Sequence, residues 1–390
     1  MAPPIGGSRM SLANGLESLR KHPVGRFATA LAGYLGAPRD LAHFTQFLSL
    51  ASGRIGLPVN LEIRTDEAGC ELIVADRILT LSPNRFAYVD TPGQLRRLEQ
   101  AGFAGLDVIV VRHRRGELFS DAASSTCRIV GNKAALPSTW RVAPAEGSLP
   151  NSPFTLRIIT SQLDRKGAGA GLAMAIPTGR AEVLGLGMLL DRLPRRPRYP
   201  YRFVYKLPDS LAGDHAVVFE RLLHVVAALR IARLDGQATT EAIMPIDYSA
   251  VRGLLMALPL VPVEVKVSAA ALKTAEAIFD RVKEDQHHVA LPDRSADGHK
   301  WFTRGHAVRY TPICYSAAKE HLDQLENEGI LEADPPKKLR VHGRTIHFKF
   351  QPGMVPPFRW RNPFQVLPLL DHDAGEFAHD LRTDSAIATE

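Results

Sequence analysis

Residues 301–350 read WFTRGHAVRYTPICYSAAKEHLDQLENEGILEADPPKKLRVHGRTIHFKF, and the spacing of their apolar side chains decides the fold of this part of the chain. Residues 301–310 are expected to form a short helix, and Thr311-Pro312 a turn. A second, amphipathic helix is expected over residues 315–328, ending at Gly329, because glycine tolerates the positive φ of a helix C-terminus. Its apolar face consists of Ala318, Leu322 and Leu325.

Two strands are expected after this helix, separated by a loop rich in Pro and Lys. The first contains Ile330 and Leu331, and the second covers residues 345–350. A helix, a turn, a second helix and a basic hairpin are the usual parts of a winged helix, which reads duplex DNA through the major groove. Residues 268–350 are therefore predicted to be a winged-helix DNA-binding domain.

Positive charge is concentrated in the hairpin and the segment after it. Residues 337–361 contain seven Lys or Arg and no Asp or Glu, so this stretch carries +7 (7 − 0), equal to the formal net charge of the whole chain. Lys and Arg on phosphates release counterions, which predicts a salt-sensitive grip on DNA. Only the N-terminal half of the second helix is expected to enter the groove, because its far end is acidic. The predicted DNA-contacting residues are Tyr315, Ser316, Lys319, Lys337, Lys338, Arg340, Arg344, Lys349, Arg359 and Arg361.

The composition of the chain is that of a globular protein with more than one domain. Its 390 residues are 45% hydrophobic and 23% charged, which predicts two or three domains with real cores. No apolar run approaches the roughly 20 residues of a membrane-spanning helix, and the N-terminus has no secretory pattern. The three cysteines are scattered and odd in number, which favours a reducing cytoplasm over a disulfide framework.

The rest of the chain reads as α/β, with helices before and after a region of strands. The expected strands are residues 59–63, 71–81, 106–111, 140–142, 154–159 and 202–205, of which 106–111 is apolar except for Asp107, as in a parallel sheet. The expected helices are residues 94–100, 215–234, 249–256 with Asp247 as N-cap, and 269–283 with Ser268 as N-cap. The predicted domains are an N-terminal helical segment (1–54), an α/β domain (55–235), a helical connector (236–267), the winged helix (268–350) and a basic then acidic tail (351–390).

This order resembles the C-terminal ATPase and winged-helix part of primase- or helicase-like AAA+ proteins of bacterial mobile elements. Two segments look like the approach to a Walker B strand: SPNRFAYVDTPGQLRRL (82–98) and GFAGLDVIVVR (102–112). The segment RFVYKLPDSL (202–211) looks like the arginine-containing strand of that family. Two further segments look like its lid helices: FERLLHVVAALRIARLDGQ (219–237) and IDYSAVRGLL (246–255). The resemblance implies an AAA+-like α/β domain and work on DNA in replication, transposition or defence.

The nucleotide-binding parts of that family are missing. A P-loop requires a Gly-Lys pair before Ser or Thr, and no Gly-Lys occurs in this sequence. Where the loop would lie stand Asp66 and Glu67, and where magnesium-binding acids would follow residues 108–111 stand Arg112, His113, Arg114 and Arg115. The sequence therefore predicts a pseudo-ATPase scaffold, with no cofactor and no catalytic residues.

A second basic patch lies at residues 192–206, RLPRRPRYPYRFVYK. Arginines interleaved with aromatic residues can hold a nucleic-acid strand by phosphate contact and base stacking, while the alternative is a solvated loop entering a strand. The candidate residues are Arg195, Arg196, Arg198 and Arg202.

No metal site is predicted. The scattered histidines and acids of residues 287–314 match no compact zinc spacing. In the tail, His372, Glu376 and His379 would share one face of a helix, but a fraying terminal helix is the ordinary interpretation.

Two alternatives to a non-enzymatic DNA-binding protein stay open. The chain could be an enzyme, either an ATPase with an unorthodox site or a metal-dependent nuclease, with Asp66 and Asp107 as the acids to test. A winged helix can also dock a protein partner or a second copy of the chain.

Overall fold

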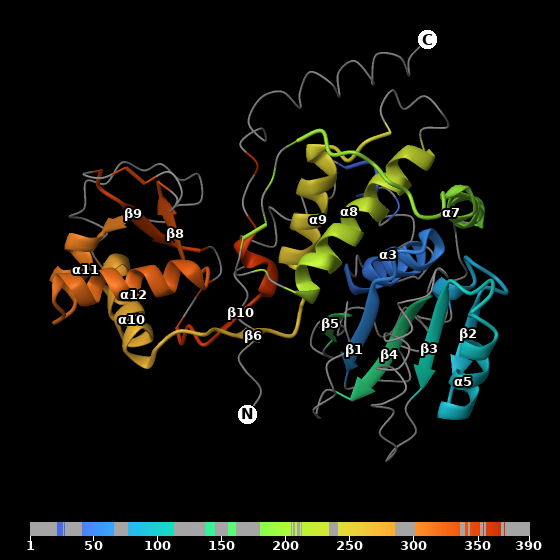
Figure 1. Ribbon diagram of the computed structural model, residues 1–390, viewed down its shortest axis with the longest axis horizontal. Helices are drawn as coiled ribbons and strands as arrows, with labels where there is room; N and C mark the ends of the chain where they lie inside the picture. The colour runs from blue at the N-terminus through green and yellow to red at the C-terminus, as the bar shows by residue number, and fades with distance from the viewer. Residues whose placement is uncertain are drawn as a thin grey trace, which may run out of the picture. The chain divides into compact units, whose positions relative to one another are not determined.

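The computed structural model of the chain divides into two compact units (Figure 1). The larger unit contains Gly15–Lys206, Gly213–Val261 and Leu369–Glu390, and the smaller contains Met1–Asn14, Leu207–Ala212 and Pro262–Pro368. The structure describes residues 22–25, 27, 41–65, 77–112, 137–144, 155–160, 180–203, 205, 207–208, 211, 213–233, 241–284, 301–335, 340–341, 344–351, 354, 356–367 and 370.

A five-stranded parallel sheet forms the centre of the larger unit, in the order β2-β3-β4-β1-β5 (Figure 1). The strands are β1 (Asn60–Thr65), β2 (Phe86–Val89), β3 (Val108–Arg112), β4 (Ser138–Pro144) and β5 (Thr155–Thr160). Val108, Ile109, Val110 and Val111 are all buried, as expected for a strand covered on both faces. The predicted α/β class with a parallel sheet is confirmed.

Five helices of the larger unit are described: α3 (Leu41–Ile55), α5 (Pro92–Gln100), α7 (Arg180–Arg192), α8 (Asp214–Arg233) and α9 (Pro245–Ala257). Helix α3 packs against β1, β4 and α8, and α8 also contacts α7, α9 and β5. The predicted helices at residues 94–100, 215–234 and 249–256 are confirmed, although α9 begins earlier, at Pro245. Within the part of the chain that the structure describes, no helix has the length and apolar character to cross a membrane.

Three local predictions for the larger unit are wrong. Residues 77–79 of the expected strand 71–81 are helical and residues 80–81 form a turn, while residues 71–76 lie outside the described residues. The described residues of 202–205 form no strand, since Tyr201 makes only an isolated bridge to Ile243 and the neighbouring rings pack on one another. Asp247 lies inside the first turn of α9 instead of capping it, because Met244 occupies the N-cap.

Helix α3 lies unusually close to the sheet because Gly53 has no side chain. A Cβ built on Gly53 would lie 1.9 Å from the carbonyl oxygen of Asp107, just before β3, and 3.0 Å from Ser138 N. Buried hydroxyl groups complete this contact: Ser52 Oγ lies 2.9 Å from Ser138 Oγ, and Trp140 Nε1 donates to Ser49 Oγ at 2.8 Å. The helix and the sheet therefore fit together through small polar residues.

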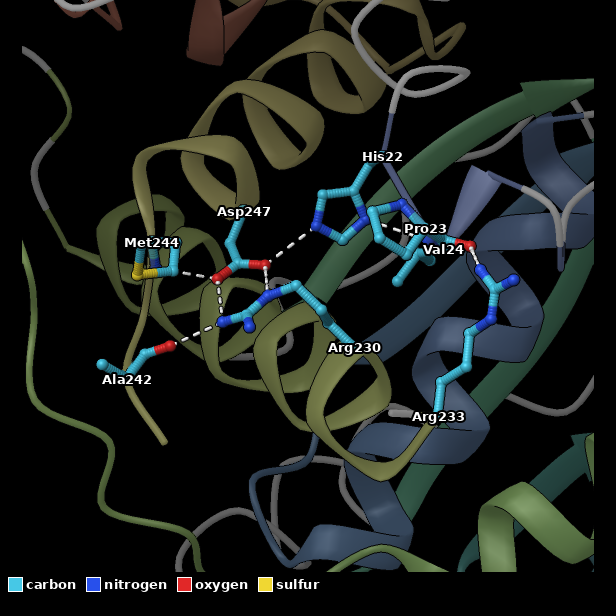
Figure 2. A network of polar contacts seen from close by, with 8 residues as sticks. All are labelled: His22, Pro23, Val24, Arg230, Arg233, Ala242, Met244 and Asp247. Carbon is cyan, nitrogen blue, oxygen red and sulfur yellow. Dashed lines mark hydrogen bonds and ion pairs between the residues drawn. The ribbon is translucent and has the colours of Figure 1, made fainter. Parts of the chain in front are cut away.

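A network of polar contacts ties residues 22–24 to α8 and α9, with His22 and Asp247 fully buried at its centre (Figure 2). Asp247 accepts hydrogen bonds from Arg230 Nε and Nη2, both at 2.9 Å, and from Met244 N at 2.8 Å. His22 Nε2 lies 2.8 Å from Asp247 Oδ1, and His22 Nδ1 accepts from Val24 N at 3.0 Å. The imidazole proton is thus on Nε2, where it is donated to the carboxylate.

The network sets the protonation state of Asp247. Burial by itself raises the pKa of this carboxyl, but the hydrogen bonds from His22 and Arg230 outweigh burial, so the pKa is lowered from its ordinary value of 3.8. Arg233 adds a neighbouring link by donating to Pro23 O at 2.9 Å (Figure 2). Asp247 is therefore a carboxylate that joins three segments far apart in the sequence.

The smaller unit combines three helices with a three-stranded antiparallel sheet. Its elements follow in the order α10 (Ala269–Glu284), β7 (Phe302–Thr303), α11 (Arg304–Tyr310), α12 (Tyr315–Asn327), β8 (Leu331–Asp334) and β9 (His347–Phe350). The sheet order is β7-β9-β8. The helix expected over residues 301–310 starts with strand β7 and becomes helical only at Arg304, where Thr303 and His306 form a capping box. Ser268 caps α10 as predicted, accepting from Ala271 N at 3.2 Å.

The smaller unit continues past residue 350. Strand β10 (Trp360–Arg361) pairs antiparallel with β6 (Val263–Glu264), and the short 3-10 helix η4 (Pro363–Val366) follows. Gly329 has a φ of +69° at the end of α12, as predicted, and a Cβ there would lie 2.1 Å from Val366 Cγ1. The C-terminal segment therefore packs against the end of α12.

Candidate functional site

The N-terminal half of α12 presents polar and aromatic side chains to solvent. Tyr315 is 60% exposed, and Ser316 and Lys319 are also exposed, while the opposite face of the helix is buried in the core. The residues of that buried face are the three predicted from their spacing, Ala318, Leu322 and Leu325. One face of α12 is thus packed in the core, and the opposite face is exposed to solvent in the N-terminal half of the helix.

One residue of α11 that sequence reasoning missed, Arg304, contacts this surface. The guanidinium of Arg304 lies over the ring of Tyr315, 5.0 Å from its centroid, which is a cation–π contact between α11 and α12. Arg309, at the other end of α11, is exposed. Because the expected helix began three residues too early, at residue 301 instead of Arg304, the position of Arg304 at the start of α11 could not be predicted.

An exposed thiol marks the start of α12. Cys314 is the N-cap residue and is exposed, and its Sγ lies 3.1 Å from Ser316 Oγ. The hydrogen bond with Ser316, together with backbone N–H groups of the first turn, lowers the pKa of the Cys314 thiol. This cysteine therefore reports directly on access to the N-terminus of α12.

The negative charge of the acidic half of α12 is partly offset by two arginines that were predicted to contact DNA. Arg340 Nη2 bonds to Glu326 Oε2 at 2.5 Å, and Arg340 Nη1 lies 3.7 Å from Asp323 Oδ1. Arg361, only 6% exposed, lies 3.8 Å from Glu328 Oε2. Burial lowers the pKa of Arg361, and Glu328 acts against that effect. These two side chains serve the internal charge balance of the unit.

The other predicted contacts are divided between the surface and the interior. Lys349 is buried, with its Nζ 4.9 Å from the ring centroid of Trp301 and 3.4 Å from Glu332 Oε2. Arg344, before β9, and Arg359, before β10, are exposed. Lys337 and Lys338 lie outside the described residues. The predicted residues that the structure places at the surface are Tyr315, Ser316, Lys319, Arg344 and Arg359.

The second basic patch belongs to the larger unit. Its four arginines, Arg195, Arg196, Arg198 and Arg202, are all exposed. They lie on the irregular segment between α7 and α8.

The acids considered for an enzymatic site have structural partners where they are described. Asp107 is buried and bonds to Arg85 Nε and Ser82 Oγ, both at 2.9 Å. It precedes β3, so it lies at the amino end of that strand, whereas ligands of parallel α/β sheets bind at the carboxyl ends. Asp66 lies outside the described residues. Within the described ranges, no group of three or more His, Cys, Asp or Glu is placed to hold a metal ion.

No known protein-family model matches this sequence, and no curated protein matches it. The interpretation of the site therefore rests on its own geometry and charge.

Proposed function

We propose that residues 268–350 form a winged helix that binds duplex DNA with the N-terminal half of α12. The order helix, strand, helix, helix, strand, strand and the sheet order β7-β9-β8 support this. The observation that carries the proposal is the exposed end of α12, where Tyr315, Ser316 and Lys319 project from a helix whose other face is buried. These side chains can reach phosphates or base edges in a major groove.

On this proposal the larger unit is a non-enzymatic scaffold of a DNA-transacting protein, in the setting of mobile-element replication, transposition or defence. The absence of a P-loop in the sequence supports this role, as does the position of Asp107 in a buried ion pair. The ion pairs of Arg340 and Arg361 also support α12 as the DNA-binding helix. Because Arg340 and Arg361 offset the carboxylates of the C-terminal half, the helix carries less repulsion toward a polyanion than its sequence suggests.

The first prediction concerns Lys319. A Lys319→Gln variant is expected to bind a mixed-sequence duplex several-fold more weakly, with the slope of log Kd against log salt reduced by about 0.9, the value for one phosphate contact. Fluorescence anisotropy titrations over a range of salt concentrations measure both quantities. The matched control is Lys273→Gln, an exposed lysine on α10 of the same unit, which should bind as the parent does. Equal behaviour of the two variants contradicts the proposal, and light scattering would then test the protein-docking alternative.

The second prediction uses the thiol at the start of α12. In a Cys70→Ser, Cys127→Ser background, Cys314 is the only thiol of the chain. Saturating duplex DNA is expected to slow its alkylation by a maleimide, because a helix N-terminus seated in a groove is shielded from the reagent. Mass spectrometry of timed samples gives the rate. Bound DNA that leaves this rate unchanged would place the contact away from α12.

A further inference from the structure

The larger unit carries a strip of exposed arginines that the function proposed for α12 does not use. Arg195, Arg198 and Arg202 are all exposed, and no Asp or Glu occurs in residues 192–206. A stretch of this kind attracts a polyanion, since each arginine can bind a phosphate through its planar fork of donors. We call residues 195–202 the arginine strip.

The backbone of the arginine strip is held in place at both ends. Arg196 N donates to Ile55 O, at the end of α3, at 2.6 Å. At the other end, Arg202 N donates to Ile243 O at 3.0 Å, and Ile243 N donates to Pro200 O at 2.9 Å. Arg196 also keeps a φ of +50°, in the left-handed region that favours glycine. The backbone of the strip is therefore fixed, so that only its side chains are ordered when they bind.

Aromatic rings lie beside the arginines. Tyr201 is the most exposed of them, at 37%, and its ring contacts Tyr205 at 5.3 Å, Phe203 at 5.9 Å and His224 at 6.1 Å between centroids. Tyr199 stacks on His224 with an interplanar angle of 25°. The ring of Tyr201 is thus held in position by packing against three other rings, which suits it to stack on a nucleic-acid base.

These rings are neutral at physiological pH. Burial lowers the pKa of His224 and raises the pKa of Tyr199, Tyr201 and Tyr205. Glu220 and Glu241 are the carboxylates close enough to contribute to the tyrosine shifts. Arg230 is a cation that acts on Tyr199 in the opposite sense, so the rings form a neutral aromatic surface that follows the arginines along the chain.

We propose that the arginine strip and Tyr201 bind single-stranded nucleic acid. Arginines at the ends of a fixed segment would hold successive phosphates, and the ring of Tyr201 would stack on a base between them. A duplex does not offer this contact, because its bases are already stacked on one another. The proposal concerns a different unit and a different ligand from the duplex site of α12, and it goes beyond that function.

The test compares two pairs of arginines of the same unit. Arg195→Gln with Arg198→Gln is expected to reduce the slope of log Kd against log salt for an oligothymidine of about 20 nucleotides by about 1.4, two contacts at about 0.7 each. The control pair, Arg96→Gln with Arg97→Gln, removes two exposed arginines of α5 and should leave the slope unchanged. Anisotropy titrations of the full chain give the slopes, and thermal unfolding verifies that both variants fold.

The aromatic contribution is tested at Tyr201. Tyr201→Ala is expected to weaken oligothymidine binding about tenfold, the effect of one lost base stack, while Tyr201→Phe keeps the ring and should bind as the parent does. Equal losses in both variants would mean that the ring does not stack on a base, and this overturns the proposal.

Duplex DNA separates this inference from the function proposed for α12. The arginine-strip pair should bind duplex normally, and Lys319→Gln should bind oligothymidine normally. Equal slopes for the strip pair and the α5 pair overturn the inference, and so does an equal loss of duplex and single-strand binding in the strip pair. If single-strand binding depends on Lys319 instead, the ligand belongs to the smaller unit and the strip is not its site.

Discussion

Replacing Asp247 by Asn is expected to lower the free energy of unfolding of the larger unit by about 3–5 kcal/mol, the usual cost of breaking a buried ion pair from one side. The two side chains are nearly isosteric, so no cavity forms. Both carboxylate oxygens accept from donors, Arg230 and His22 at one and Arg230 and Met244 at the other. The amide of Asn must place its NH₂ group where one of the two carboxylate oxygens accepted hydrogen bonds, so that N–H groups there face other N–H groups. Arg230 also loses the negative charge with which it pairs.

Urea denaturation measures this loss, and the control is a neutralised carboxyl at the surface. Glu220→Gln removes an exposed carboxylate of α8 and is expected to change the free energy of unfolding by no more than about 0.5 kcal/mol. A loss of similar size in both variants would show that the network of Figure 2 contributes no more than a surface charge.

The same network predicts how stability depends on pH. The folded pKa of Asp247 lies below its ordinary value of 3.8, so the unfolded chain binds this proton more readily. The contribution of Asp247 is therefore complete above the ordinary pKa and is lost as the pH falls through the folded value. Acidification below about pH 4 should destabilise the parent protein more steeply than Asp247→Asn. Parallel pH profiles for the two proteins would refute this.

Substituting Gly53 by Ala is expected to cost about 3 kcal/mol of unfolding free energy, at the upper end of overpacking effects. The new Cβ would lie 1.9 Å from the carbonyl oxygen of Asp107. That atom belongs to the backbone beside β3 and cannot rotate away as a flexible side chain could. Helix α3 must therefore move off the sheet, which breaks the hydrogen bond of Trp140 to Ser49.

The natural control is a glycine of α7. Gly185 has nothing within 4 Å of an added Cβ, so Gly185→Ala should stabilise the protein by about 0.5–1 kcal/mol through helix propensity alone. Thermal or urea unfolding of the two variants should thus give shifts of opposite sign. If Gly53→Ala stabilises the protein as Gly185→Ala does, α3 does not pack closely against the sheet at Gly53.

Much of the fold was predictable, because it follows from local patterns. The spacing of Ala318, Leu322 and Leu325 predicts α12 and its buried face, and the run at residues 106–111, apolar except for Asp107, predicts a strand buried in a parallel sheet. The wrong strand at 202–205 has a physical cause. Alternating basic and aromatic residues have the period of a strand, but here the rings pack with those of Phe219 and Tyr248 instead of entering a sheet.

The candidate site was less predictable, because charge alone does not say where a side chain goes. Arg340 and Arg361 have the same sequence signal as Arg344 and Arg359, yet the first two pair with α12 and the last two are exposed. The acidic partners of Arg340 and Arg361 precede the basic run in the sequence, so the pairs form only when the chain folds. For the same reason, the burial of Asp107 beside Arg85 could not be predicted from the apolar strand that follows it.

The pairing of Arg340 with α12 changes how a loss of function at this residue must be interpreted. Removing the arginine would set free the carboxylates of Glu326 and Asp323 on the helix itself. A duplex would then be repelled by two unmasked negative charges, although no phosphate contact had been lost. A weakened Arg340→Ala variant is therefore no evidence of direct contact. If Arg340 acts only by offsetting these two carboxylates, a variant that also carries Glu326→Gln and Asp323→Asn recovers duplex binding.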